Sequence, residues 1–206
     1  MQALDGRLAL DADVFYIRWD DIQLNVDRGD GFNGFMNAGQ AVIKGFELTA
    51  HAQATEHLLL GGQLTYTDGA ITELGPGIAA TGVAAVGNAV PAVPRFSTSG
   101  FAEWGTAFAG DGWAYVRGDV SYITTRYGGF ASTAPIPLHP YALGDIRFGV
   151  NKGLYSAAIF VTNIADRRAQ LSNQAYSGLH DGQPYSWLRY NVNIPRTIGL
   201  TFSRRF

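Results

Sequence analysis

Apolar and polar side chains alternate with a period of two along most of this chain of 206 residues. In the segment 113–123, for example, even positions carry Val116, Val120 and Tyr122, whereas odd positions carry Arg117 and Asp119. Such a period places successive side chains on opposite faces of a β-strand, because an amphipathic helix would repeat about every 3.6 residues. The alternation therefore predicts strands with one apolar and one polar face.

The chain is predicted to contain about eight such strands, each of about ten residues, and no helix. The segments are 7–17, 41–53, 58–67, 95–104, 113–123, 141–150, 155–164 and 197–203. The facing of segment 155–164 stays open, because that segment is apolar almost throughout. Soluble strands average about five or six residues, whereas about ten residues cross a bilayer at a tilt of roughly 45°.

The connections between these strands alternate in length. Long ones lie near 26–40, 68–94, 126–140 and 166–184, and short ones near 54–57, 105–112 and 151–154. In an antiparallel meander, all short turns then lie at one end of the sheet and all long loops at the other. Transmembrane β-barrels have this asymmetry. In each strand, we call the alternate positions that carry the apolar residues the apolar parity, and the other positions the polar parity. Four aromatic residues of the apolar parity lie at the long-loop ends of their strands: Tyr16, Tyr66, Phe96 and Tyr122. They predict an aromatic girdle at the membrane interface.

The polar parity supplies the candidate lumen-facing residues, which are Asp11, Asp13, Glu47, His51, Arg117, Asp119, Asp145 and Arg147. They cannot form the lipid face, because one charge at the bilayer midplane costs about 2–4 kcal/mol. The interior of a closed eight-stranded barrel is just wide enough for side chains to fill, so its charges would need complete pairing. We therefore expect the chain to be part of a larger barrel.

Composition excludes several other classes of protein. The net charge of −2 does not suggest a nucleic-acid partner, and the absence of cysteine excludes a disulfide scaffold and cysteine-type zinc sites. The four histidines show no converging spacing, so we expect no metal site and no cofactor. No catalytic motif is present, and we expect that the protein is not an enzyme. The first residues lack the features of a signal peptide.

Five motifs follow one another along the predicted strands. They are LALDADVFYIRWDDIQL at 8–24, the hairpin at 37–69 with Asn37, Ala38, Gly39, Gly45 and Glu47, VPRFSTSG at 93–100, IFVTNIADRR at 159–168 and IPRTIGLTFSRRF at 194–206. In this order they resemble the C-terminal third of a TonB-dependent outer-membrane receptor. The resemblance spans nearly the whole chain.

This resemblance implies that residues 1–206 are the C-terminal part of a receptor barrel of about 22 strands, without its plug and N-terminal strands. It implies an antiparallel, all-β meander in the outer membrane of a Gram-negative bacterium. The function implied is energy-coupled uptake of an iron–siderophore complex or a similar scarce nutrient, whose identity the sequence does not give. Implied partners are the lipid bilayer, the outer-membrane barrel assembly machinery and, through the missing N-terminal part only, the TonB complex.

The last strand resembles an outer-membrane assembly signal. Such a signal ends in an aromatic residue and carries apolar residues at alternate positions before it. Phe206 would be the terminal aromatic, and Phe202, Leu200 and Ile198 the alternate apolar residues. Arg204 departs from this pattern.

Two other functions stay open at this point. The chain could be a stand-alone eight-stranded structural or adhesion barrel of the outer membrane, or a soluble lipocalin-like binding barrel with its apolar face inside. The sequence leaves open whether the 206 residues are a fragment and whether they close into a barrel.

The sequence also predicts the location of two further segments near the long loops. An aromatic and basic cluster, formed by Tyr185, Trp187, Arg189 and Tyr190, is predicted to join the interface girdle, with a ligand path as the alternative. The nearly uncharged segment 75–93 is predicted either to contact an apolar ligand or to pack over the barrel mouth.

Overall fold

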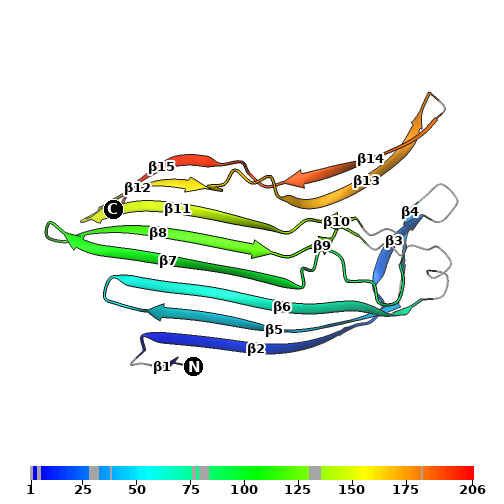
Figure 1. Ribbon diagram of the computed structural model, residues 1–206, viewed down its shortest axis with the longest axis horizontal. Helices are drawn as coiled ribbons and strands as arrows, with labels where there is room; N and C mark the ends of the chain where they lie inside the picture. The colour runs from blue at the N-terminus through cyan, green and yellow to red at the C-terminus, as the bar shows by residue number, and fades with distance from the viewer. Residues whose placement is uncertain are drawn as a thin grey trace.

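The computed structural model describes residues 2–3, 6–27, 33–37, 39–75, 78, 84–129, 136–181 and 183–206. In this part of the chain, the main sheet contains nine antiparallel strands in the order β1-β2-β5-β6-β7-β8-β11-β12-β15 (Figure 1). The bounds of its strands are β1 Gln2–Ala3, β2 Leu8–Trp19, β5 Gly39–Gln53, β6 Leu58–Leu74, β7 Phe96–Phe108, β8 Gly112–Ile123, β11 Tyr141–Lys152, β12 Tyr155–Thr162 and β15 Thr197–Arg204. Apart from the two-residue β1, these are the eight strands that the alternation predicts.

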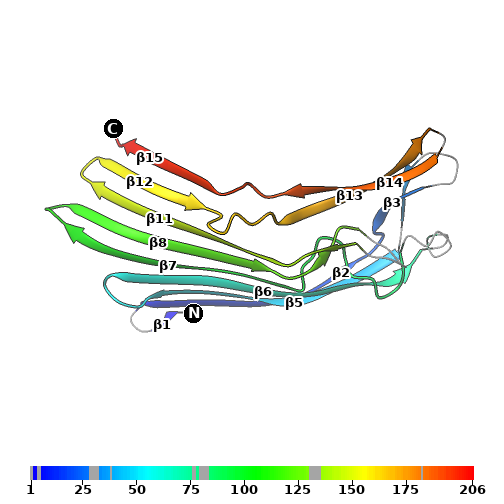
Figure 2. The ribbon, with the colours of Figure 1, turned by 45° about the horizontal axis from the view of Figure 1, so that its top comes forward.

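The main sheet is a single open layer in both ribbon views (Figures 1 and 2). Each long strand pairs with the next long strand along the chain, as in an up-and-down meander. The two ends of the sheet, β1 and β15, are not paired with each other among the described residues. The predicted all-β antiparallel meander is confirmed, and the sheet is not closed. No described segment forms a helix long and apolar enough to span a membrane.

The connections keep the predicted asymmetry, with short turns at one end of the sheet and long excursions at the other (Figure 1). The long excursions contain strand pairs that the sequence analysis missed. These pairs are β3 (Gln23–Asp27) with β4 (Asn33–Asn37), β9 (Arg126–Tyr127) with β10 (Pro137–Leu138), and β13 (Gln170–His180) with β14 (Gln183–Val192). Ala38, in the predicted Asn-Ala-Gly motif, lies outside the described residues.

The strand register places the apolar parity of every long strand on one face of the sheet. Val116 of β8, for example, lies opposite Trp104 of β7 and Phe148 of β11. This apolar face is uncovered: Val120 is 58% exposed and Leu200 is 81% exposed. A continuous apolar surface of this kind marks an interaction or membrane surface rather than a wall facing water.

The pairing of β12 resolves the facing of segment 155–164. Ile159 lies opposite Phe148 on one side and Leu200 on the other, so it belongs to the apolar face. Tyr155, Ala157 and Val161 share this face because they lie an even number of residues away. Phe160 points to the polar face.

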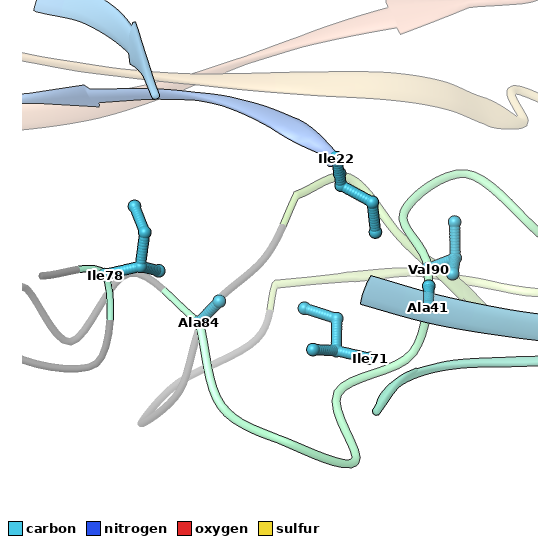
Figure 3. Close-up of a cluster of buried hydrophobic side chains, with 6 residues drawn as sticks. All are labelled: Ile22, Ala41, Ile71, Ile78, Ala84 and Val90. Carbon is cyan, nitrogen blue, oxygen red and sulfur yellow. The ribbon is translucent and has the colours of Figure 1, made fainter. Parts of the chain in front are cut away.

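A small hydrophobic core forms at the long-loop end instead of between two layers. It contains Ile22, Ala41, Ile71, Ile78, Ala84 and Val90 (Figure 3). A β-bridge between Ala70 and Ala89 brings the described part of the uncharged segment 75–93 back onto β6. The described residues of this segment therefore pack against the sheet, and both the apolar ligand and the packing over a barrel mouth stay predictions.

Candidate functional site

The polar face of the sheet gathers charged residues in two neighbouring rows. In the first row, Arg117 of β8 lies between Glu103 of β7 and Arg147 of β11. In the second row, Asp119 of β8 lies between Phe101 of β7 and Asp145 of β11. Since adjacent strands are only about 4.8 Å apart, these side chains can contact one another across the sheet.

Arg117 is the centre of this cluster. Its Nε donates to both carboxylate oxygens of Asp119 at 3.0 Å, and its Nη2 donates to Asp119 Oδ1 at 2.7 Å. Its Nη1 donates to Glu103 Oε2 at 3.4 Å. The guanidinium also lies 3.7 Å from the ring centroid of Phe101, within the range of a cation–π contact. Two carboxylates and one aromatic ring therefore fix the orientation of Arg117.

A pocket of about 370 Å³ lies beside Arg117. Its polar lining comes from β5, β6, β7, β8 and β11 and consists of Thr49, His51, Gln63, Ser99, Arg117, Asp119, Ser121 and Asp145. The His51 ring lies 6.0 Å from the Phe101 ring, and both residues line this pocket. The pocket offers both hydrogen-bond donors and acceptors.

The other predicted residues occupy the same face without joining this pocket. Asp13 of β2 lies directly opposite Glu47 of β5. Asp11 lies two residues earlier on β2, on the same face, opposite Thr49. Among the described residues, these three carboxylates form no ion pair. They make the β2–β5 part of the polar face acidic. Arg147 instead lies 5.2 Å from the ring of Phe160.

Aromatic side chains on the polar face cover glycines of neighbouring strands, a feature the sequence analysis missed. A Cβ atom at Gly61 would collide with the ring of Phe101, and one at Gly149 would collide with Tyr115. Phe160 covers Gly199 in the same way. Each ring fills the space that a side chain would otherwise occupy. These aromatic–glycine contacts could not be predicted from the sequence, because they depend on the register between neighbouring strands.

Asn163 anchors the long-loop end of β12. It is 5% exposed and has a positive φ of 51°. Its Nδ2 donates to the carbonyl oxygens of Arg167 at 3.0 Å and Ile194 at 3.1 Å, and its Oδ1 accepts from the Arg167 amide at 2.9 Å. Its own amide donates to Asp145 Oδ1 at 2.7 Å. Asn163 thus ties the segments before β13 and β15 to the charged rows of the polar face.

Asp166 links the turn after β12 to the segment before β15. Its Oδ1 accepts a 2.9 Å hydrogen bond from the Arg196 amide. This bond chiefly lowers the pKa of Asp166 from its ordinary value, and the positive charges of Arg168 and Arg196 lower it further. The carboxylate is therefore held ionised at neutral pH.

The β13–β14 hairpin is fixed at its base by Arg126. This buried residue donates from Nη2 to the carbonyl oxygens of Gln170 at 3.2 Å and Leu171 at 2.9 Å. Tyr185, Trp187 and Tyr190 lie on β14, which pairs only with β13. They lie outside the main sheet, and their place in an interface girdle, or on a ligand path, stays a prediction. The other predicted girdle residues do lie on the apolar face, with Tyr66 opposite Phe96.

The residues of the predicted assembly signal lie on β15 and just after it. Ile198, Leu200 and Phe202 face Val161, Ile159 and Ala157 of β12 on the apolar face. Phe206 is fully exposed, and the guanidinium of Arg204 lies 5.2 Å from its ring. No group of three or more potential metal ligands occurs within the described ranges.

The chain matches known proteins in its family and its fold. The family described as "TonB dependent receptor-like, beta-barrel" matches residues 3–194. No curated protein matches the chain.

Three solved receptor structures are similar to this chain. The ferric yersiniabactin uptake receptor FyuA from Yersinia pestis has a TM-score of 0.72 at 22% identity, over 98% of this chain and 28% of its own. The ferric-catecholate import receptor Fiu from E. coli K12, in its closed form, has a TM-score of 0.71 at 19% identity, over 100% and 26%. The siderophore receptor PiuA from Acinetobacter baumannii has a TM-score of 0.72 at 16% identity, over 99% and 27%.

These likenesses establish the fold, and the chain spans little more than a quarter of each receptor. The family match covers most of the chain, from β1 to the segment just before β15. The chain therefore belongs to the TonB-dependent receptor-like β-barrel family.

Proposed function

We propose that this chain is the C-terminal part of the barrel of an outer-membrane receptor that takes up a ferric siderophore or a similar scarce nutrient with energy from the TonB complex. The observation that carries the proposal is the division of one uncovered sheet into an apolar face and a charged face. Such a wall suits a protein with lipid on one side and a wet lumen on the other.

In this proposal, the charged rows around Arg117 line the lumen and the pocket beside them contacts a polar cargo or the protein's own plug. Fixed charges suit this role, because Arg117 is held by Glu103 and Asp119 and does not have to be ordered when a partner arrives. The acidic group of Asp11, Asp13 and Glu47 extends the charged surface over β2 and β5.

Recognition of the nutrient is assigned to the long-loop end. The β13–β14 hairpin extends beyond the main sheet and is anchored at its base by Arg126 (Figure 1). Its exposed aromatic side chains, with Arg189, offer stacking and cationic contacts of the kind that bind aromatic or anionic ligands. The FyuA, Fiu and PiuA receptors are named for siderophores or their ferric complexes, and this supports the same cargo class here.

The two alternatives receive less support. A stand-alone eight-stranded barrel requires the first and last strands of the main sheet to pair, and the described residues show no such pairing. A lipocalin-like barrel likewise requires a closed sheet, which the described residues do not form, and the family match is to a receptor barrel.

An uptake experiment tests the proposal. A strain that lacks the gene is compared with its complemented parent for uptake of radiolabelled iron bound to catecholate, hydroxamate or carboxylate siderophores, and of labelled cobalamin. We expect loss of uptake for one of these nutrients, restored by the gene and abolished again in a strain without TonB. Unchanged uptake of the whole panel, with the protein present in the outer membrane of the complemented strain, would contradict the proposal.

A further inference from the structure

Three buried polar atoms at the base of the β13–β14 hairpin have no hydrogen-bond partner among the described residues. They are Nη1 of Arg126, Oε1 of Gln170 and Nδ2 of Asn173. Buried polar groups in folded proteins nearly always have a partner, and an exception calls for an ion or a water molecule at the site. The three atoms therefore point to a bound species between the β9–β10 pair and β13.

The three side chains lie where β9 and the residues after it meet the start of β13. Arg126 Nη2 donates to the carbonyl oxygens of Gln170 and Leu171, so Nη1 of the same planar guanidinium lies beside these residues. Two residues after Arg126, a Cβ atom at Gly128 would collide with the Asn173 side-chain amide. β10, which pairs with β9, also contacts β13 (Figure 1). The unpaired atoms therefore lie in one small region.

The surroundings of Arg126 are apolar. Leu138 lies opposite Arg126 in the β9–β10 pair and is 1% exposed. The ring centroid of the buried Tyr141 lies 5.5 Å from the guanidinium carbon. Arg126 itself is 7% exposed, and within the described ranges it forms no ion pair with a carboxylate. A buried charge without a counter-charge is costly, because apolar surroundings do not solvate it.

A small anion satisfies both the hydrogen-bonding groups and the charge, whereas a water molecule satisfies only the first. A halide accepts from Arg126 Nη1 and Asn173 Nδ2 and neutralises the guanidinium. Rotation of the Gln170 amide by half a turn replaces Oε1 by Nε2 and adds a third donor. The burial of Arg126 limits the size of the ligand, which favours a monatomic halide over a phosphate or the carboxylate of a bulky nutrient.

We propose that Arg126, Gln170 and Asn173 form a chloride site that fixes the base of the β13–β14 hairpin to the β9–β10 pair. The anion bridges Arg126 of β9 and Asn173 of β13, so its binding ties two of the long excursions together. When the anion leaves, the charge of Arg126 loses its counter-charge, and the hairpin base opens more readily. This inference depends neither on the identity of the transported nutrient nor on the membrane placement of the sheet.

Hydrogen exchange tests the proposal. The protein encoded by the complete gene is purified in detergent, and exchange of the β13 and β14 amides is followed by mass spectrometry in sodium chloride and in sodium gluconate of equal ionic strength. Chloride that binds only the closed hairpin slows exchange by a factor of one plus the ratio of its concentration to Kd, which is about tenfold at roughly ten times Kd. We expect this slowing in chloride and in bromide, relative to gluconate.

Two variants locate the effect. Arg126→Met removes the charge and keeps an unbranched side chain, so its exchange rates should be equal in chloride and gluconate. Asn173→Asp places a carboxylate of the chain itself beside Arg126, so it should exchange slowly even in gluconate and gain nothing from chloride. The matched control is Arg95→Met, at the long-loop end with a side chain that is 72% exposed, and it should keep the full chloride effect.

Three results would overturn the proposal. Equal exchange of the wild type in chloride and gluconate would assign a water molecule to the site. Slowing by acetate that equals or exceeds the slowing by chloride would assign the site to a carboxylate of another molecule. A chloride effect that persists in Arg126→Met and Asn173→Asp would place the anion elsewhere. Heat-modifiable gel mobility verifies that each variant is folded.

Discussion

At the residue scale, the face of each side chain could be predicted from the sequence, but its contacts could not. The alternation placed Arg117 and Asp119 on the polar face, and only the structure shows that Arg117 forms ion pairs with both Asp119 and Glu103. The aromatic–glycine contacts, such as Tyr115 over Gly149, depend on which residues of neighbouring strands lie opposite each other. Register is a property of two strands, and the alternation within one strand restricts it only to shifts of an even number of residues.

Asn163 offers the sharpest residue test of the turn that follows β12. Asn163→Ala should destabilise the fold by about 2–4 kcal/mol, because it removes the side-chain partner of two carbonyl groups and one amide and places alanine at a positive φ. The midpoint of heat-modifiable gel mobility measures this loss. Asn163→Gly loses the same hydrogen bonds but tolerates the φ, so its midpoint should lie between those of the wild type and Asn163→Ala. A wild-type midpoint for the alanine variant would contradict this account.

Asp166 should make the same turn sensitive to acid. Because its pKa is lowered in the folded protein, its charge stabilises the turn above the ordinary carboxyl value of about 3.9 and stops doing so as the pH falls through the lower folded value. Asp166→Asn keeps the shape without the charge. We expect it to be less stable than the wild type at pH 7, and the difference to shrink to nothing on acidification. A difference that is independent of pH would show that the charge is not the cause.

At the element scale, the long strands of the main sheet could be predicted because each one separates two different environments. Lipid on one face and polar groups on the other impose strict alternation over about ten residues. The β13–β14 hairpin escaped prediction because it lies beyond the sheet, where both faces can carry mixed side chains. Its aromatic residues Tyr185, Trp187 and Tyr190 therefore lie outside the main sheet.

Arginine substitutions test the facing of the strands. Leu60→Arg or Val120→Arg places a charge on the apolar face and should destabilise the inserted protein by about 2–4 kcal/mol, with loss of protein from the outer membrane. Gln63→Arg and Ser121→Arg are the matched controls, on β6 and β8 but on the polar face, and should assemble nearly normally. Quantitative immunoblots of outer-membrane fractions compare the four variants. Equal damage in both sets would refute the facing assignment.

At the scale of the whole molecule, the neutral average hydropathy of the sequence conceals two opposite surfaces. The fold class and the family could be predicted, because alternation, loop asymmetry and motif order are all properties of the sequence. The nutrient could not, because the proposed function assigns its recognition to the loops, whose arrangement alternation does not encode. The main sheet is open, and its edge strands are β1 and β15.

The C-terminus is predicted to guide assembly of the whole molecule. Phe206 is fully exposed beside Arg204, at the edge of the sheet, where another protein can reach it. Deleting Phe206 should slow insertion of the protein encoded by the complete gene, measured by pulse-chase appearance of the heat-modifiable form. Deleting one residue from an exposed loop tip serves as the control. Insertion at the wild-type rate would remove Phe206 from the assembly signal.

The central claim is that one face of this sheet contacts lipid and the other faces an aqueous lumen. The chain contains no cysteine, so single cysteines introduced along β8 can each carry a spin label. In bilayers, labels at Val116, Val120 and Tyr122 should respond to lipid-dissolved oxygen, and labels at Tyr115, Asp119 and Ser121 should not. The account predicts this alternation with a period of two. Oxygen accessibility of the opposite parity, or equal accessibility at all six positions, would contradict it.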